Sequence, residues 1–343
     1  MASDARRDTS RGRGRSFVIA ACSLAALASA SAQGTASTAH VSTDALHFTV
    51  PAWAFPGTLP PNPNATPDTT PRSIPGSTAR FSLAQMRNLY WAPDWQPDSH
   101  PPMPDVVAHG RNPGVYACAY CHLPNGRGRP ENATLAGLPA AYIIEQIDAF
   151  RSGARKSAVA DWAAGAGMGI EASRATDAEI AEAAAYFSKL RLVPRERVVE
   201  TARVPKTRAQ GYLYVVLPDS GTEPLGHRII ETPASTERHE LHDPNETFVT
   251  YVPRGSLARG RAIATKGGGV TTACVTCHGP DLRGVGVIPP LAGRSPTYIV
   301  RQLAGFRTGT RSTTATQPMS LVTANMGDDD MIAVAAYIAT RRP

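Results

Sequence analysis

The sequence contains no apolar run that approaches the roughly 20 residues of a membrane-spanning helix. It also has no basic stripe interleaved with aromatic residues, which argues against nucleic-acid binding. Cysteine is scarce: of the five, one lies near the N-terminus and four occupy two identical short motifs, so none is left for a structural disulfide. The rest of the composition suits a folded protein, because 42% of the 343 residues are hydrophobic and the length fits two domains with connections.

Residues 1–32 have the features of an export signal that is cleaved from the mature protein. Five arginines lie between positions 6 and 15, residues 17–27 are apolar, and Ala30-Ser31-Ala32 is a small-x-small cleavage site, so the mature chain is predicted to begin near Gln33. A lipoprotein cleavage box at 19–22 is the alternative, but it leaves only about five apolar residues where an h-region has roughly 7–15. The segment carries a net charge of +3, so the formal charge of +7 falls to about +4 in the mature chain.

From about residue 104 the chain repeats itself. At an offset of 156 residues the two Cys-x-x-Cys-His motifs align, and so do the Leu-Ala-Gly, Tyr-Ile, Gln and Phe-Arg-x-Gly-x-Arg segments that follow them. At an offset of 151, Met168 aligns with Met319 and Ala185-Tyr186 aligns with Ala336-Tyr337, because the first copy has five additional residues in the loop around 162–167. A repeat of this length predicts two domains of one fold.

The apolar residues of each copy recur with a helical period and predict three helices. The resulting fold class is mainly α, with long Gly- and Pro-rich loops between the helices. The expected ranges are 104–117, 139–152 and 177–190 in the first copy, with Asp177 as the cap of the last helix, and 254–268, 295–307 and 328–340 in the second.

Two segments outside the repeat have a different character. Residues 51–75 contain eight prolines and predict an extended arm. Residues 191–253 contain β-type runs at 212–217, 227–232 and 247–252, which predict a small β-hairpin or ribbon that joins the domains. The predicted organisation is a signal peptide at 1–32, an arm at 33–80, a first domain at 81–194, a linker at 195–253 and a second domain at 254–343.

The Cys-x-x-Cys-His motif is typical of covalent haem attachment. Two thiols three residues apart lie on one side of a turn and add to the vinyl groups of haem, and the histidine that follows is held at the iron. A thioredoxin-like dithiol would need a βαβ context, and a zinc site of four cysteines would join pairs 156 residues apart and leave both histidines unexplained. We therefore predict two covalently bound haem c groups, attached through Cys118 and Cys121 and through Cys274 and Cys277, with His122 and His278 as iron ligands.

The second axial ligand of each iron is predicted to come from a loop before the last helix. Met168 and Met319 lie there, each 18 residues before the matching tyrosine. Met326 has no counterpart in the first copy and adjoins a helix cap, Met103 precedes the first motif, and His109 has no histidine counterpart in the second copy. Met168 and Met319 are therefore the predicted ligands, and methionine opposite histidine favours a closed, low-spin iron suited to electron transfer.

Other residues are candidates for contacts around these sites. His239 and His242, in a segment rich in charged residues, allow a metal site but are more typical of a solvated charged loop. The second ring nitrogen of each ligating histidine needs a partner, and the backbone carbonyls of Pro289 and Ala133 are the candidates. Side chains that either meet haem propionates or pack locally are Tyr142, Tyr298, Arg151 and Arg307.

The repeated pattern over about 105–190 and 255–341 resembles the cytochrome c4 family, which has two haem domains. The resemblance implies two class I cytochrome c domains that face each other, and His122, Met168, His278 and Met319 as iron ligands. It also implies an electron carrier of the bacterial periplasm that delivers to terminal oxidases. The sequence departs from the family in three features. Leu123 stands where the family has a glycine, and Gly279 retains that glycine in the second copy. The other two features are the long linker and the N-terminal arm.

The predicted function is transfer of single electrons between redox partners by a periplasmic protein that is not itself an enzyme. The partners implied are a dehydrogenase, a quinol oxidoreductase or a terminal oxidase, and peripheral association with a membrane stays open. Two alternatives remain: the haem subunit of a dehydrogenase complex, and a redox enzyme such as a dihaem peroxidase or a thiosulfate dehydrogenase. An enzyme needs an iron with a vacant position, and a methionine in both copies argues against it.

Overall fold

The computed structural model describes residues 48–57, 66 and 68–343. The chain divides into two compact units, Met1–Ser42 and Thr43–Pro343, and all the described residues belong to the second. The predicted signal peptide and its cleavage site lie outside the described residues. Within the described part, no helix is both long and apolar enough to cross a membrane.

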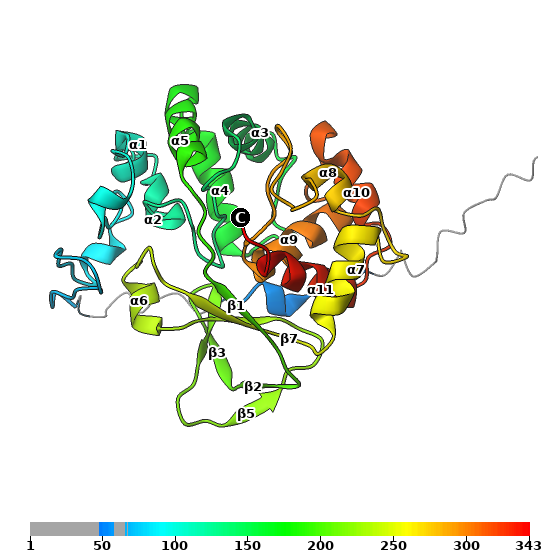
Figure 1. Cartoon of the computed structure of the whole chain (residues 1–343). Coiled ribbons are helices and arrows are strands. Elements are labelled where there is room, and N and C mark those ends of the chain that lie inside the picture. Colours follow the sequence, from blue (N-terminus) through cyan, green and yellow to red (C-terminus); the bar gives the residue numbers. More distant parts are fainter. Residues whose placement is uncertain (1–47, 58–65, 67) are drawn as a thin grey trace, which may run out of the picture. The chain divides into compact units, whose positions relative to one another are not determined.

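The first domain is built from α1 (Asp105–Ala108), α2 (Cys118–His122), α3 (Ala140–Arg151), α4 (Ala163–Arg174) and α5 (Asp177–Lys189) (Figure 1). Helices α3 and α5 match the predicted ranges and pack against each other around a core that includes Ile143, Ala184 and Phe187. The cap of α5 is Thr176 instead of Asp177. The Thr176 hydroxyl accepts a hydrogen bond from the Glu179 backbone N–H, and the Thr176 backbone N–H donates one to the Glu179 carboxylate.

The helix predicted over 104–117 is wrong beyond residue 108. Gly110 has φ +65°, and a Cβ placed on it would lie 2.2 Å from the Val115 carbonyl oxygen. The backbone of Arg111 pairs with that of Val115 through two hydrogen bonds of 2.8 and 3.0 Å. The chain therefore forms a tight turn. The apolar pattern that predicted one helix spans a short helix, this turn and the residues that lead to α2.

The second domain contains α7 (Ser256–Lys266), α8 (Val275–His278), α9 (Pro296–Arg307), α10 (Gln317–Thr323) and α11 (Asp328–Ala339). Helices α7, α9 and α11 agree with the prediction to within two residues at each end. α11 crosses α7 so closely that a Cβ on Gly260 would lie 1.9 Å from the Ala333 carbonyl oxygen. This close approach requires glycine at position 260 and buries the apolar face of α11, which includes Met331 and Ile332.

The linker contains more strands than the predicted hairpin. β1 (Glu196–Glu200) runs parallel to β7 (Phe248–Val252), which pairs antiparallel with β6 (Ile230–Pro233). Two further ladders join β2 (Arg203–Pro205) to β5 (Thr222–Pro224) and β3 (Thr207–Gln210) to β4 (Leu213–Val216), and α6 (Thr236–Glu240) precedes β7. The predicted runs correspond to β4, β6 and β7, but β4 does not pair with β7. The remaining strands are short and polar, so their sequences carry little alternation.

Buried polar contacts attach the linker to both haem domains. Arg127 of the first domain donates to the Pro244 carbonyl of the linker (3.1 Å), and Arg195 of the linker donates to the Gly128 carbonyl. Glu231 of β6 accepts hydrogen bonds from the Ser295 hydroxyl (2.8 Å) and the Thr297 backbone (3.1 Å) at the start of α9. The strands lie together on one side of the helices (Figure 1), so the linker spans the two domains as a packed element.

Glu196 is a buried carboxyl in this linker and makes stability depend on pH. Its side chain is 1% exposed, and burial together with the nearby Glu231 carboxylate raises its pKa from 4.5 to about 8, against the opposing effect of Arg195. Because the folded state holds this proton more tightly than the unfolded state, the free energy of unfolding falls as pH rises from about 4.5 to about 8.

Glu196→Gln is therefore expected to reduce the loss of thermal stability between about pH 5 and about pH 9. The difference in Tm between the two pH values should shrink by at least about 3 °C, the shift that roughly 1 kcal/mol produces in a protein of this size. Thermal denaturation of the haem-loaded protein measures it, with Glu182→Gln on an exposed position of α5 as the matched control. Equal pH dependence in Glu196→Gln and the wild type would contradict this account.

Candidate haem-binding sites

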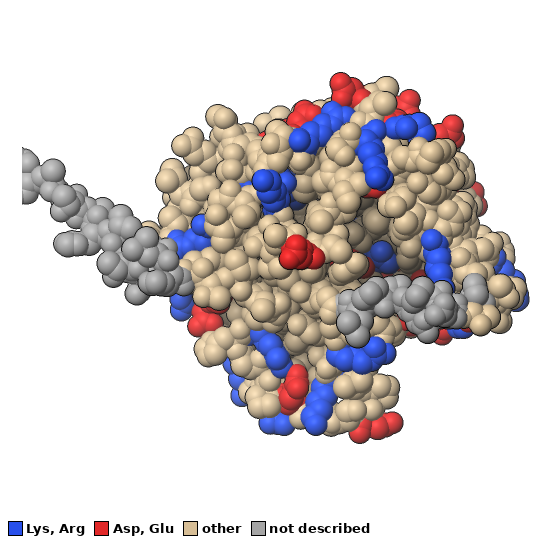
Figure 2. Space-filling model, turned by 180° about the vertical axis from the view of Figure 1, so that it is seen from behind, with Lys and Arg blue, Asp and Glu red and all other residues tan. Residues whose placement is uncertain are grey.

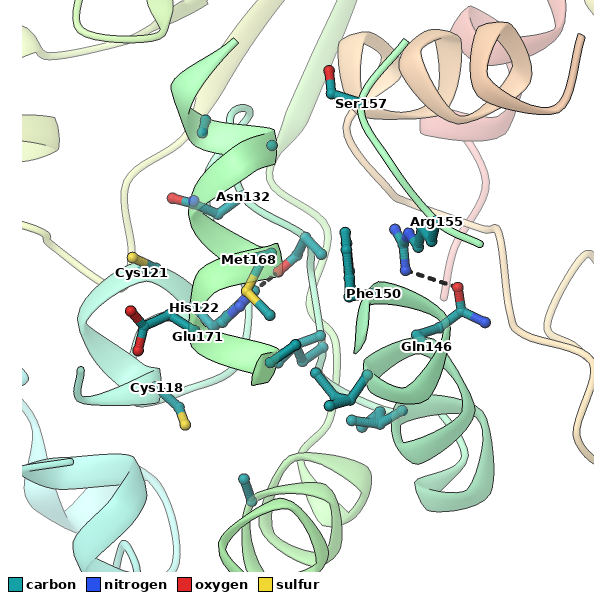
Figure 3. Close-up of a pocket in the computed structure, with 18 of the residues that line it drawn as sticks. Cys118, Cys121, His122, Asn132, Gln146, Phe150, Arg155, Ser157, Met168 and Glu171 are labelled. Carbon is teal, nitrogen blue, oxygen red and sulfur yellow. Dashed lines mark hydrogen bonds between the residues drawn. The ribbon is translucent and has the colours of Figure 1, made fainter. Parts of the chain in front are cut away.

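The first motif places Cys118, Cys121 and His122 along one helical turn, α2, at the wall of a cavity in the first domain (Figure 3). Neither pair of motif cysteines, Cys118 with Cys121 or Cys274 with Cys277, forms a disulfide. Burial raises the pKa of Cys118 to about 12 and also raises that of Cys121. A redox dithiol works through a thiolate of lowered pKa, and burial at this motif shifts the pKa in the opposite direction.

Each motif histidine is held by a backbone carbonyl. His122 Nδ1 lies 2.8 Å from the Ala133 carbonyl oxygen, and His278 Nδ1 lies 2.8 Å from that of Pro289. A carbonyl only accepts, so Nδ1 donates and the lone pair is on Nε2, the arrangement of a ligating imidazole. Burial lowers the pKa of His122 to about 4 and also lowers that of His278, which keeps both rings neutral. The sequence predicted both carbonyl partners.

The residue after each histidine adopts a left-handed conformation. Gly279 has φ +81° and Leu123 has φ +63°. For a residue other than glycine this conformation costs about 1–3 kcal/mol. The Leu123 side chain is 2% exposed, so its burial offsets part of that cost. The departure from glycine in the first copy is therefore a local strain, and His122 makes the same 2.8 Å hydrogen bond to a backbone carbonyl as His278.

The two predicted methionine ligands lie on helices, whereas the sequence predicted loops. Met168 is on α4 and lines the same cavity as His122, and Figure 3 shows both among the residues around that cavity. Met319 is on α10 and is half-buried against the core of the second domain. Around Met168 the chain reads as a loop because Gly165, Gly167 and Gly169 are poor helix formers.

The other candidate ligands lie elsewhere. Met326 is 2% exposed within the core of the second domain, as expected for a packing residue. Met103 packs against the core of the first domain, and His109 is exposed at the end of α1. None of the three lines the cavity that contains His122. Met168 is thus the methionine that the fold brings into the cavity of the first motif.

Equivalent residues of the two domains contact each other reciprocally at this cavity. Arg155 donates to the Tyr298 hydroxyl (3.1 Å) and to Gln302 Oε1 (3.0 Å). Arg311, its counterpart in the second copy, donates to the Tyr142 hydroxyl (2.7 Å) and to Gln146 Oε1 (2.7 Å). The alignment of the repeat paired these residues, but it did not predict that they meet across the domain interface.

Arg155 and Arg311 lack an acidic partner among the described residues. Burial and then the charge of Arg311 lower the pKa of Arg155, and Arg311 Nε has no hydrogen-bond partner in the described structure. Arg311 is buried and Arg155 is half-buried, and two such guanidinium groups with neutral partners favour a nearby anion. The propionates of a haem are such anions, so the residues present fit this group.

Arg151 and Arg307, for which the sequence left propionate contact or local packing open, pack locally. Arg151 donates to the Ala172 carbonyl (2.8 Å) and to Asp177 Oδ1 (2.7 Å), and Arg307 donates to the Thr323 carbonyl (3.2 Å). These carbonyls lie near the C-terminal ends of α4 and α10, where a cation is favourable. Both arginines therefore fix the helices that carry Met168 and Met319.

The solvated loop expected at His239 and His242 is wrong. The two histidines are 8% and 6% exposed, because the linker packs there against the first domain. The His242 ring lies 4.8 Å from the Tyr120 ring, and His239 Nε2 lies 3.6 Å from Glu131 Oε1. Among the residues that the structure describes, no group of three metal-ligating side chains of the His, Cys, Asp or Glu type comes together.

The chain is similar to known cytochromes c. The cytochrome c family model matches residues 113–191 and 257–342. The thiosulfate dehydrogenase electron acceptor of Stutzerimonas stutzeri is 30% identical over 233 residues, which cover 67% of this chain and 81% of that protein. Cytochrome c4 of Pseudomonas aeruginosa is 36% identical over 90 residues, or 24% of this chain and 43% of that protein.

Among solved structures, thiosulfate dehydrogenase from Marichromatium purpuratum is similar at 28% identity with a TM-score of 0.44. The match covers 68% of this chain and 38% of the other. The two matched segments of the family model each contain one complete Cys-x-x-Cys-His motif. The chain therefore belongs to the cytochrome c family: it is a dihaem class I c-type cytochrome with two covalently attached haem c groups, and it is an electron carrier.

Proposed function

We propose that one haem is linked through Cys118 and Cys121 with His122 and Met168 as axial ligands, and the other through Cys274 and Cys277 with His278 and Met319. The observation that carries this proposal is the hydrogen bond of each histidine Nδ1 to a backbone carbonyl 11 residues later in the sequence, at 2.8 Å in both domains. That bond leaves Nε2 as the free ring nitrogen. Figure 3 supports Met168 as its partner in the first domain.

The chain's own residues would fix the state of each iron. A bound haem supplies one-electron exchange between ferric and ferrous iron. The carbonyls of Ala133 and Pro289 orient the imidazoles, and the apolar walls of the domains exclude water. Arg155 and Arg311 would hold propionates at the domain interface. Met168 and Met319 would hold the irons together with the histidines and would leave no site for a substrate, so the arrangement favours a carrier over a redox enzyme.

The domain organisation proposed from the repeat has support in the packing. The cytochrome c domains would be 81–194 and 254–343, with the linker at 195–253. Trp95 donates from Nε1 to the Leu241 carbonyl (2.7 Å), which ties the segment before the first motif to the linker. In the arm, 33–80, the described carbonyl of Pro56 accepts a hydrogen bond of 2.8 Å from Trp162 at the cavity.

We further propose that the protein is exported to the periplasm, that residues 1–32 are removed, and that its electron donor is a dehydrogenase. The export features of the sequence support the location. The names of two relatives, electron acceptors of thiosulfate dehydrogenase in Stutzerimonas stutzeri and Thiomonas intermedia, support this kind of donor.

The same names favour a second candidate function, a haem subunit held in a stable complex with such an enzyme. Co-purification of a dehydrogenase would distinguish this subunit from a free carrier.

A carrier and a redox enzyme differ in their reaction with peroxide. The reduced wild-type protein is expected to be reoxidised slowly by hydrogen peroxide without sustained turnover, because methionine would close both irons. Stopped-flow spectroscopy of the haem-loaded protein measures this, with cyanide binding to the oxidised protein as a second probe of vacant sites. Sustained peroxide turnover near the roughly 10 s⁻¹ typical of enzymes would overturn the carrier proposal.

A further inference from the structure

The helix that carries Met168 has a low intrinsic stability and begins at a buried tryptophan. α4 contains Gly165, Gly167 and Gly169, and glycine in a helix interior is destabilising relative to alanine. Trp162 is the residue immediately before α4, and its carbonyl accepts a hydrogen bond from the Gly165 backbone N–H (2.9 Å). Trp162 is 8% exposed and lines the same cavity as Met168. The position of α4 therefore depends on contacts outside the helix, and those of Trp162 are at its start.

Three parts of the chain that are distant in the sequence converge on the Trp162 ring. From the arm, the Pro56 carbonyl accepts the 2.8 Å hydrogen bond from Trp162 Nε1, and the Phe55 ring lies edge-on with its centre 5.5 Å away. From the linker, the Tyr212 ring lies edge-on at 5.9 Å. From the second domain, the guanidinium carbon of Arg301 lies 4.7 Å from the ring centre. The arm, the linker and the other domain thus all hold this tryptophan.

Arg301 also fastens the arm at this place. Lysine and arginine side chains are scattered over the surface seen in Figure 2, whereas Arg301 is 5% exposed. It donates from Nη1 to the Ala54 carbonyl (2.9 Å) and from Nη2 to the Pro130 carbonyl. Ala54 ends the short helix η2 (Ala52–Ala54, blue in Figure 1), which packs against α9, the helix of Arg301. A desolvated cation over an indole face is attractive, so the same side chain stabilises both the arm and Trp162.

The segment that leads to Met319 in the second domain is different. Residues 308–316 contain no aromatic residue. α10 has 7 residues, against 12 in α4, and Leu321 on α10 is 76% exposed. The difference arises because the five additional residues around 162–167 and the arm belong to the first copy alone. The two methionines are therefore supported by unequal surroundings.

We propose that Trp162 is a positioning residue that keeps Met168 bound to the first iron. The arm, the linker and Arg301 hold its ring, so the first iron exchanges its methionine for other ligands more slowly than the second. This inference rests on the proposed ligation of the irons by Met168 and Met319. Replacing a methionine requires local opening of the helix that carries it, and opening is rarer where more packed contacts must be broken. The arm and the linker, in which this chain departs from the cytochrome c4 family, thereby become part of the first haem site.

Cyanide binding to the oxidised, haem-loaded protein tests the proposal, because cyanide replaces methionine and abolishes its charge-transfer band. The wild type should lose the band in two phases, and Met168→Ala should lack the slower phase. Trp162→Leu should raise the rate constant of the slower phase by about tenfold and leave the faster phase unchanged. Trp162→Phe keeps an aromatic ring and should raise it by at most about threefold. Tyr212→Ala, at a residue 36% exposed, should raise it by about threefold.

The matched control is Trp91→Leu. Trp91 packs against Phe81 with ring centres 4.8 Å apart and does not line the cavity, so both phases should stay within about twofold of the wild type. A single phase in the wild type, an unchanged slower phase in Trp162→Leu, or an equal acceleration in Trp91→Leu would overturn the positioning role. If Trp162→Leu does not fold with two haems, an unchanged slower phase in Tyr212→Ala overturns it instead.

The methionine variants separate this proposal from the one on which it rests. If Met168→Ala keeps the whole charge-transfer band, the proposed ligation of the first iron fails, whatever the tryptophan variants do. If Met168→Ala loses half of the band and Trp162→Leu binds cyanide as the wild type does, the ligation stands and the role of Trp162 is wrong.

Discussion

Replacing Cys274 and Cys277 together with alanine is expected to yield a protein with one haem per chain and an unfolded second domain. The helices of that domain are joined by long loops, and α8, which carries the motif, has four residues. Covalent haem binds the folded chain, so its loss removes both buried apolar surface and the free energy of ligation from the native state. The haem content should fall by about half, and far-ultraviolet circular dichroism should show the loss of helix in α7, α9 and α11.

The control variant for this prediction is Cys22→Ala, which removes a cysteine of the predicted signal peptide and leaves both motifs intact. It should leave both haems and the helix content unchanged. Removing Cys118 and Cys121 should likewise halve the haem content. Two haems per chain in the Cys274/Cys277 double variant, by the pyridine haemochrome assay, would mean that the second motif is not the attachment site.

Met168→Ala and Met319→Ala are each expected to remove about half of the long-wavelength charge-transfer band that marks methionine bound to ferric iron. The reduction potential of the affected haem should fall by on the order of 0.1 V, within the roughly 0.8 V that axial ligands control. The vacated position should bind cyanide. Near-infrared absorption and a redox titration of the purified variants measure these changes.

Met326→Ala is the control that separates ligation from packing. Met326 is 2% exposed in the core of the second domain, so its truncation should lower the free energy of unfolding by about 2–5 kcal/mol. It should leave the charge-transfer band at full intensity. If Met326→Ala loses half of the band and Met319→Ala does not, the ligand of the second iron has been assigned to the wrong methionine.

The internal repeat made the haem domains predictable from sequence. Aligning two copies identified the helices α3, α5, α9 and α11 to within two residues and selected Met168 and Met319 from the available methionines. It also transferred the carbonyl role from Pro289 to Ala133, although the two residues have different side chains. These features depend on local sequence or on the spacing from the motif, which an alignment preserves.

The features that escaped prediction depend on contacts between segments that are distant in the sequence. His239 and His242 are buried because the linker packs on the first domain, and their own sequence is that of an exposed segment. The Arg155 and Arg311 contacts require the arrangement of one domain against the other. α4 forms despite three glycines, one of which, Gly165, packs where a Cβ would lie 2.7 Å from Ser157 Cβ. In each case tertiary packing overrides the local signal.

The near-infrared absorption of the oxidised wild-type protein, scaled to the number of haems per chain, tests the central claim most directly. The proposed ligands predict two covalently bound haems per chain and a methionine–iron band with the intensity of two such centres. One haem per chain, or a band that corresponds to fewer than two methionine-ligated irons, would contradict the assignment of two closed His/Met sites in this electron carrier.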